Sequence, residues 1–300
     1  MTLFASRRTY NNSTHKFTNN AATLTRYVQI TNTAGQVSTG GVISREDWHA
    51  QVLRAAQSRD ILFFVHGFNT SQTTMLKRHR ALEEGIRAHG YRGAVVGFDW
   101  PSDGNVLAYD ADRTDAKKVA PYLVTEAIGL FLNENPRYRL HILAHSMGTY
   151  LTLRGFSGVG DAPGARKWGV DQAMFAAADA DAEWMRKGAW GSLVMDRRAN
   201  RLTNYYNRND AVLQLAGDFV HGGRRRAGRE GLPDLVEKDQ VDVDTTERYA
   251  AFARKGAQLS HRYYFEDDGF FRDVALTIAG KDANDMPTRR ITDGDAVLKV

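Results

Sequence analysis

The sequence contains no cysteine among its 300 residues. This absence excludes disulfide frameworks, thiolate zinc sites, iron–sulfur clusters and a cysteine nucleophile. Long apolar runs are also missing. The longest, such as Ile61–Val65 and Ala173–Ala178, fall far short of the roughly 18 residues that cross a bilayer, so we expect no membrane span. No apolar segment follows the first charges, Arg7 and Arg8, so no secretory signal is visible and we expect a cytoplasmic location.

Charge of one sign is not in large excess either. Lysine and arginine total 40 against 35 acidic residues, which gives a net charge of +5. The densest basic cluster, Arg224–Arg226, has glycines as neighbours rather than the aromatic residues on which bases stack. We therefore interpret this cluster as a solvent-exposed loop and expect no nucleic-acid partner. With 42% hydrophobic and 25% charged residues, the composition is that of an ordinary globular protein.

Strand-like and helix-like segments alternate along most of the chain. Short apolar or β-branched runs predict strands at residues 24–30, 61–65, 94–98, 140–144, 170–177, 202–206 and 240–243. Apolar residues at helical spacing predict helices after Ser44, over 75–86, over 119–130, over 146–156, over 183–195, after Asp210 and over 270–278. This alternation predicts an α/β fold with a mostly parallel sheet and helices on both faces.

The chain shows no linker that would divide it, so we expect one domain over residues 1–300. Residues 1–20 are polar and rich in Thr and Asn, and we expect them to be irregular. The connection over residues 211–240 is the least regular part of the core region. Long connections of this kind often act as lids or binding loops, so this segment is a candidate lid or loop insertion.

The most informative local pattern is Leu143-Ala-His-Ser-Met-Gly148. It follows an apolar strand and opens a helix, which is the context of a nucleophile elbow. The serine of such an elbow sits on a tight turn that closes only when small residues flank it. Here the small residues are Ala144 and Gly148, and Ala144 departs from the usual glycine. The alternative interpretation is that Ser146 only caps the helix.

Two backbone N–H groups are expected to stabilise the oxyanion of an acyl-transfer reaction. One is that of Met147, because the first N–H groups of a helix have no partner within it. The other is that of Phe68, which follows the strand over residues 61–65. We expect Gly67 to permit an unusual backbone that turns the Phe68 N–H into the site, although a plain turn glycine is the alternative.

The base must be a histidine that follows the serine if the chain order is Ser, acid, His. Only His221 and His261 meet this condition. His221 lies in a loop rich in Gly and Arg, without a strand between it and the helix after Asp210. His261 follows the strand over residues 240–243 and precedes Tyr263-Tyr-Phe265, so we favour His261 as the base.

The acid should follow a strand between the serine and the histidine. Asp210 comes just after the strand at 202–206, while Asp179 and Asp181 come just after the strand at 170–177. In this chain order the acid usually follows the later strand, so we favour Asp210. Asp179 stays open as an alternative acid, and Asp181 is also suited to cap the next helix.

Five short motifs occur in a fixed order: His66-Gly-Phe-Asn69, Phe98-Asp-Trp-Pro-Ser102, Ala144-His-Ser-Met-Gly148, Asn209-Asp210 and Ser260-His261. With them, the chain resembles a bacterial α/β-hydrolase group catalogued as a domain of unknown function, over roughly residues 24–270. The resemblance implies the α/β-hydrolase fold and a Ser-His-Asp triad. It implies Ser146 as nucleophile, Asp210 as acid, His261 as base, and Phe68 and Met147 as oxyanion donors. It implies no cofactor and no particular substrate.

Together these residues predict a serine hydrolase that cleaves carboxylic esters through an acyl-enzyme. Without a long apolar lid helix, short or medium acyl chains are favoured over long ones. Trp100 and Tyr109 are candidate residues of the substrate pocket, and the alternative for Trp100 is to pack beneath the sheet edge.

Other functions stay open or lack support. A thioesterase or an amidase would use the same triad, and a non-catalytic binding module could keep the same fold. No predicted helix carries a His-x-x-x-His pattern, and no Gly-x-Gly-x-x-Gly turn follows a predicted strand, so we expect neither a metal nor a dinucleotide cofactor. The expected partner is a small-molecule ester. The sequence does not set the oligomeric state.

Overall fold

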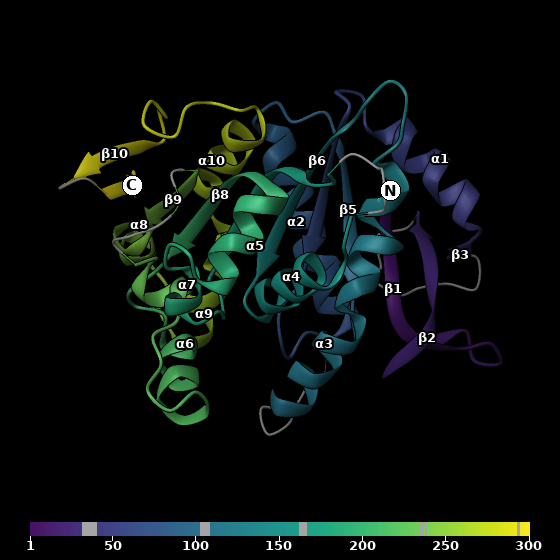
Figure 1. Ribbon diagram of the computed structural model, residues 1–300, viewed down its shortest axis with the longest axis horizontal. Coiled ribbons are helices and arrows are strands. Elements are labelled where there is room, and N and C mark those ends of the chain that lie inside the picture. The colour runs from purple at the N-terminus through teal and green to yellow at the C-terminus, as the bar shows by residue number, and fades with distance from the viewer. Residues whose placement is uncertain (32–40, 103–108, 162–166, 234–236, 238, 293–294) are drawn as a thin grey trace.

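The computed structural model describes residues 1–31, 41–102, 109–161, 167–233, 237, 239–292 and 295–300. Its strands form one sheet in the order β10-β11-β9-β8-β7-β6-β4-β5-β1-β2-β3 (Figure 1). The strands are β1 (Thr2–Asn11), β2 (Lys16–Ile30), β3 (Val42–Ile43), β4 (Asp60–Val65), β5 (Ala94–Asp99), β6 (Arg139–His145), β7 (Val170–Ala176), β8 (Ala199–Tyr206), β9 (Gln240–Asp244), β10 (Arg289–Thr292) and β11 (Asp295–Leu298).

The centre of the sheet is parallel and its two edges are antiparallel hairpins. From β1 through β5, β4, β6, β7, β8 and β9 to β11, every neighbouring pair is parallel. The pairs β1–β2, β2–β3 and β10–β11 are antiparallel. The predicted α/β class with a mostly parallel sheet is confirmed.

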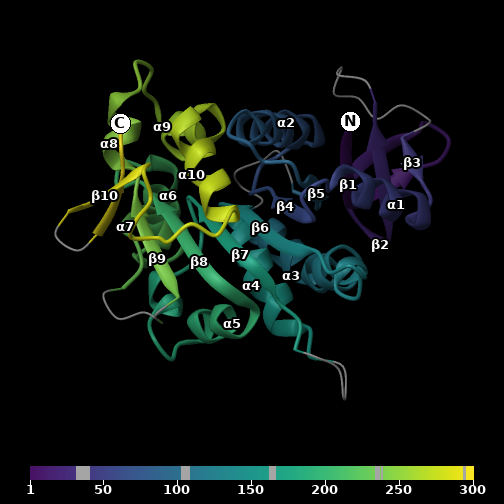
Figure 2. The ribbon, with the colours of Figure 1, turned by 90° about the horizontal axis from the view of Figure 1, so that it is seen from above.

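Helices cover both faces of the sheet, as Figure 2 shows from above. One face carries α1 (Arg45–Ala55), α3 (Tyr109–Thr125), η2 (Ile128–Phe131), α4 (Met147–Gly158) and α5 (Trp190–Arg198), and the other carries α2 (Gln72–Ala88), α8 (Thr246–Ala251), α9 (Ala257–Arg262), η5 (Tyr263–Glu266) and α10 (Asp268–Ile278). The connections include η3 (Ala182–Met185), α6 (Ala211–Leu215), η4 (Ala216–Val220) and α7 (Ala227–Glu230).

The central strands are apolar throughout because both of their faces are buried. Along β4, Ile61, Phe63 and Val65 join the cluster of one face, while Leu62 and Phe64 join the cluster of the other. This alternation follows from the two-residue period of a strand. Among the described residues, no helix combines the length and apolar character needed to cross a membrane.

The expectation that residues 1–20 are irregular is wrong. Residues 2–11 form β1, which lies between β5 and β2 in the sheet, and β2 begins at Lys16. The polar composition is misleading because Arg7 and Arg8 are buried and paired with acids, Glu126 and Asp99. A buried cation is tolerated when it is paired, so a charged segment can be an interior strand.

Two predicted helices have different bounds. The helix expected over 183–195 is divided into η3 and α5, because Gly188 adopts a left-handed conformation with φ of 78° between them. The helix expected over 119–130 begins earlier, at Tyr109, and contains Pro121 before it ends at Thr125. The helix expected after Ser44 is confirmed as α1, and the Ser44 hydroxyl caps it by accepting a hydrogen bond from the Asp47 N–H.

The segment after Asp210 is more ordered than a plain loop. Its described part contains α6, η4 and α7, which are five, five and four residues long. Figure 1 shows α6 and the first turns of α3 extending from the same edge of the sheet. Residues 234–236 and 238 of the candidate lid lie outside the described residues.

Candidate active site

Ser146 occupies the turn between β6 and α4 in an unusual backbone conformation, with φ of 56° and ψ of −127°. For a residue with a side chain this conformation is strained, typically by about 1–3 kcal/mol, and persists only where the surroundings impose it. Ser146 stands at the N-cap position of α4, but its side chain makes no capping hydrogen bond. The interpretation of Ser146 as only a helix cap therefore does not account for its hydroxyl.

Two glycines make this turn possible by leaving room for neighbouring chain segments. A Cβ added to Gly148 would lie 2.6 Å from the carbonyl oxygens of both Val65 and His66. A Cβ added to Gly67 would lie 2.6 Å from the Cβ of Ser146. Gly67 is not among the residues with a positive φ, so our expected reason for it was wrong. It permits close approach to Ser146 rather than an unusual backbone.

His261 and Asp210 meet directly. The His261 Nδ1 is 2.7 Å from Asp210 Oδ2, and because a carboxylate accepts, the proton lies on Nδ1. The other oxygen of Asp210 accepts from the N–H groups of Val212 and Leu213 at 3.0 and 2.9 Å. Asp210 is thus fully buried, caps α6 with Oδ1 and orients His261 with Oδ2. Residue 210 can do both because it is the N-cap of α6, at the end of the short connection that follows β8.

The two atoms expected to react, the Ser146 hydroxyl oxygen and His261 Nε2, have no hydrogen-bond partner among the described residues. Within the described part of the chain, neither the Ser146 hydroxyl nor the His261 Nε2 forms a hydrogen bond, with each other or with a third residue. Both residues are mostly buried, with 6% and 8% of their surfaces exposed. In an enzyme without substrate, catalytic hydrogen bonds are often long and tighten only when the substrate is bound.

His145 holds the backbone of His261 through a hydrogen bond, and the sequence did not predict this role. Its Nε2 is 2.8 Å from the carbonyl oxygen of His261, so Nε2 donates. Burial lowers the pKa of His145 well below its ordinary value, and the charges of His261 and Arg78 lower it further. A neutral His145 thus holds the backbone of the candidate base. Its position next to Ser146 on the last residue of β6 was the available indication.

The two expected oxyanion donors both border Ser146. Met147 is the first residue of α4, and Phe68 follows Gly67, which packs on Ser146. Among the described residues, neither the Phe68 nor the Met147 amide has a hydrogen-bond acceptor. Unpaired N–H groups at this place favour a negatively charged oxygen.

The alternative acids and the alternative base form a separate network. The carboxylate of Asp179 is buried, pairs with Arg226 at 2.7 Å and accepts from the Tyr109 hydroxyl. His221 Nε2 is 2.7 Å from the same hydroxyl. Asp181 caps η3 through the Glu183 N–H. The structure therefore brings His261 to Asp210, and brings His221 to Tyr109 and Asp179.

Two further expectations need correction. Trp100 does not line an open pocket, because its side chain is fully buried. It stacks on His66 at an interplanar angle of 7° and donates to the His66 carbonyl at 2.8 Å. Arg226 is not a solvent-exposed member of its cluster, because it is 2% exposed and paired with Asp179. Tyr109 packs its ring against Phe68, while its hydroxyl is held by Asp179 and His221.

Other concave sites lie away from these residues. A cavity of about 460 Å³ is lined by Arg139, Val170 and Ala199, which begin β6, β7 and β8. It therefore opens at the amino ends of the strands, opposite Ser146. Across the described ranges, no group of three or more His, Asp and Glu side chains is arranged to hold a metal ion.

Comparison with known proteins gives a family. A family model described as "Alpha/beta hydrolase of unknown function (DUF900)" matches residues 42–267. The uncharacterized protein alr1448 of Nostoc sp. is 45% identical over 58 residues, which are 19% of this chain and 15% of that protein. The family match includes residues 146, 210 and 261, while β1 and β2 lie outside it.

Solved structures give more distant likenesses. One comes from work on LipS and LipT, two metagenome-derived lipolytic enzymes, with 14% identity, 76% coverage of this chain, 96% of that chain and a TM-score of 0.43. Another is the Pyrococcus furiosus esterase PF2001, with 14% identity, 73% and 81% coverage and a TM-score of 0.38.

Proposed function

The chain belongs to this family of α/β hydrolases of unknown function, and from that premise we propose that it is a serine hydrolase of carboxylic esters. Ser146 is the nucleophile, His261 the base and Asp210 the acid of its triad. The substrate is a small-molecule ester with a short or medium acyl chain. The reaction passes through an acyl-enzyme on Ser146.

In the first half of the reaction, the Ser146 oxygen attacks the ester carbonyl and His261 Nε2 takes the hydroxyl proton. The C–O bond to the alcohol then breaks, and His261 returns the proton to the leaving alkoxide. Asp210 keeps the other His261 proton on Nδ1 and stabilises the transient imidazolium. In the second half, water attacks the acyl-enzyme with His261 as base again, and the acid and free Ser146 are released.

Charge that develops on the carbonyl oxygen is stabilised by the N–H groups of Phe68 and Met147. Preorganised donors of this kind usually supply the largest single contribution to such a rate enhancement, about 10²–10³ for one donor. The donors are backbone groups on two different segments. The proposal therefore needs the loop after β4 and the start of α4 to be held together, which the contact of Gly67 with Ser146 achieves.

The observation that carries the proposal is the pair His261–Asp210 at 2.7 Å, with His261 Nε2 left unpaired and its backbone held by His145, the neighbour of a strained Ser146 whose hydroxyl is also unpaired. A non-catalytic module would have no need of a strained backbone at residue 146, since such strain costs stability and is stored at functional sites.

The acyl-chain preference follows from the segment after Asp210. In its described part α6 continues directly into η4, and the exposed large apolar side chains there are Leu215, Phe219 and Val220, which offer too little apolar surface to cover a long chain. Thioesters and amides are attacked by the same triad, so a thioesterase or an amidase is the second candidate. Rates on matched ester, thioester and amide substrates of one acyl group separate these activities.

The test is hydrolysis of chromogenic esters of graded acyl length. Ser146→Ala should lower kcat/KM by about 10⁴-fold or more, and Asp210→Asn by about 10⁴-fold. Ser157→Ala is the matched control, because Ser157 is exposed on the same helix and should keep the wild-type rate. Near-normal hydrolysis by Ser146→Ala would refute the proposal.

A further inference from the structure

We propose that Arg8 and Asp99 are positioning residues for the loop from His66 to Thr70, which carries the Phe68 amide. This inference rests on the proposed function, because it assigns these residues a part in building the oxyanion hole. Neither residue touches the site of reaction. They act through the two ends of the loop, and they come from β1 and β5.

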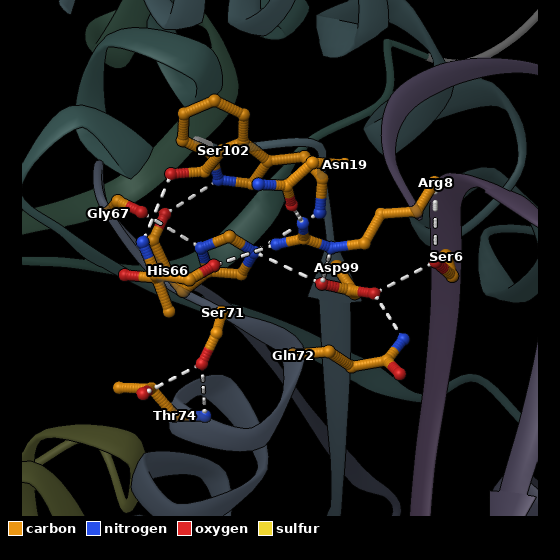
Figure 3. A network of polar contacts seen from close by, with 12 residues as sticks. Ser6, Arg8, Asn19, His66, Gly67, Ser71, Gln72, Thr74, Asp99 and Ser102 are labelled. Carbon is orange, nitrogen blue, oxygen red and sulfur yellow. Dashed lines mark hydrogen bonds and ion pairs between the residues drawn. The ribbon is translucent and has the colours of Figure 1, made fainter. Parts of the chain in front are cut away.

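Arg8 and Asp99 form a buried ion pair. Arg8 Nε is 2.8 Å from Asp99 Oδ1, and the side chains are 2% and 0% exposed. The second carboxylate oxygen accepts from Ser6 Oγ at 2.9 Å and from Gln72 Nε2 at 2.8 Å (Figure 3). Burial alone would raise the pKa of Asp99, but the charge and the hydrogen bond of Arg8 hold it well below its ordinary value. The pair is therefore ionised and fully engaged.

The first end of the loop is held through His66. Trp100, the residue after Asp99, donates its N–H to His66 Nε2 at 3.2 Å. The His66 Nδ1 is 2.9 Å from the Gly67 carbonyl oxygen, and because a carbonyl only accepts, Nδ1 carries the proton. Burial lowers the pKa of His66, in agreement with a neutral ring.

This hydrogen bond fixes the direction of the proposed oxyanion donor. The Gly67 carbonyl and the Phe68 N–H belong to one planar trans peptide and point in opposite directions. Holding the carbonyl toward His66 therefore aims the Phe68 N–H away from it. Asp99, fixed by Arg8, sets the place of Trp100 at the end of β5 and, through it, the place of His66.

The second end of the loop is held by Arg8 itself. Its NH2 group donates to the Thr70 carbonyl at 2.8 Å. The Thr70 hydroxyl in turn donates to the Phe68 carbonyl at 3.0 Å, and the Thr70 N–H donates to Ser102 Oγ at 3.2 Å. One guanidinium group thus joins Asp99 to Thr70 and, through them, both ends of the loop.

The conformation of the loop requires such support. Asn69 adopts a left-handed backbone with φ of 49°, and Gly67 packs so closely on Ser146 that no Cβ fits. A strained segment at a functional site persists only when surrounding contacts determine it. Arg8 supplies these contacts from β1, which lies outside the residues of the family match.

The test compares Arg8→Lys with Arg289→Lys. Arg289 is a matched control, since it forms an equally buried pair with Asp273, at 2.6 Å and 1% and 0% exposure, at the far edge of the sheet. Lysine keeps the charge but cannot join Asp99 and Thr70 together. We expect Arg8→Lys to lower kcat for a chromogenic ester by about 10–100-fold, with little change in KM. A trifluoromethyl ketone, which forms an oxyanion on the serine, should bind more weakly by a similar factor.

Arg289→Lys should keep kcat and inhibitor affinity even if both variants lower the melting temperature equally. If Arg8→Lys loses no more kcat than Arg289→Lys while the wild type is active, the inference is overturned and the proposed function stands. A folded wild type that neither cleaves esters nor reacts with a fluorophosphonate overturns both. If Arg8→Lys does not fold, the test uses instead the double variant Ser6→Ala, Gln72→Ala, which removes two hydrogen bonds to Asp99. A lower kcat at constant KM supports the inference, and an unchanged kcat refutes it.

Discussion

Ser146 adopts a backbone conformation that is rare for a residue with a side chain. Two glycines leave room for the chain segments around it. The φ of Ser146 is 56°, and its side chain forms no capping hydrogen bond with α4. Gly67 and Gly148 bring the loop after β4 within contact of this turn. At the scale of residues, the proposed chemistry therefore depends on the lack of a side chain at Gly67 and Gly148 as well as on the triad side chains.

Gly67→Ala tests this dependence. Its new Cβ would lie 2.6 Å from the Ser146 Cβ, so either the loop or the serine must shift. We expect kcat/KM for an ester to fall by about 100-fold, because misplacement by about 1 Å can cost that much. Gly158→Ala is the control, since its Cβ meets nothing within 4 Å. Equal activity of the two variants in steady-state assays would contradict the account.

Local neighbours allowed the sequence to predict some of these residues but not others. Ser146 is predicted from the strand before it and the helix after it, and His261 from the chain order. Arg8 could not be found, because the partners that make its burial tolerable, Asp99 and the Thr70 carbonyl, are more than 60 positions away. The reason for Gly67 was equally hidden, since it depends on contact with Ser146 across the sheet edge.

At the scale of elements, the connection after β8 is fastened to α3 beside the proposed site. Arg113 Nη1 is 3.3 Å from His221 Nδ1, and His221 Nε2 is 2.7 Å from the Tyr109 hydroxyl. The Tyr109 hydroxyl donates to Asp179, so His221 Nε2 must donate to Tyr109 and Nδ1 must accept from Arg113. This chain of hydrogen bonds requires a neutral His221.

Acid should weaken this connection. Burial and the charge of Arg226 lower the pKa of His221 from 6.5 to about 4. The unfolded chain binds this proton at the ordinary pKa and the folded chain does not, so the contribution to stability is present above pH 6.5 and is lost as the pH falls toward about 4. Melting temperatures of the wild type and of His221→Gln should therefore diverge over this window, with the wild type losing more. A constant difference between them would contradict the lowered pKa.

Helices and strands were predictable where the apolar residues follow a single helical or strand period. The apolar strands β4 to β8 and the helices α2, α4 and α10 stand out because both sheet faces, or one helix face, are buried. The strand expected over residues 24–30 is confirmed as part of β2, which begins earlier, at Lys16. β1 was missed because its buried polar residues are matched by partners distant in sequence. The helix over 183–195 was misjudged because the left-handed Gly188 interrupts an otherwise continuous spacing of apolar residues.

At the scale of the whole molecule, the two ends of the chain lie on opposite sides of the sheet (Figure 1) but contribute unequally to its stability. β1 is an interior strand between β5 and β2, and it carries the fully buried Phe4 together with Arg8. β11 pairs with β9 over only two residue pairs, Ala296 with Val243 and Val297 with Asp244.

Truncation should reveal this inequality. Removal of residues 1–31 exposes the edge of β5 and leaves Asp99 buried without its cation, which is strongly destabilising. We expect this variant not to fold to a monomer. Removal of residues 291–300 keeps Arg289 on Asp273 and should give a folded protein of lower melting temperature. Circular dichroism and gel filtration distinguish these results, and a stable monomer without residues 1–31 would refute the expected role of β1.

The central claim is that Ser146 is an activated nucleophile served by His261. The most direct test is to treat the folded protein with a fluorophosphonate and locate the adduct by peptide mass spectrometry. We predict one adduct, on Ser146, that is absent in Ser146→Ala and forms far more slowly in His261→Ala. An unlabelled folded protein, or an adduct on another residue that persists in Ser146→Ala, would contradict the claim.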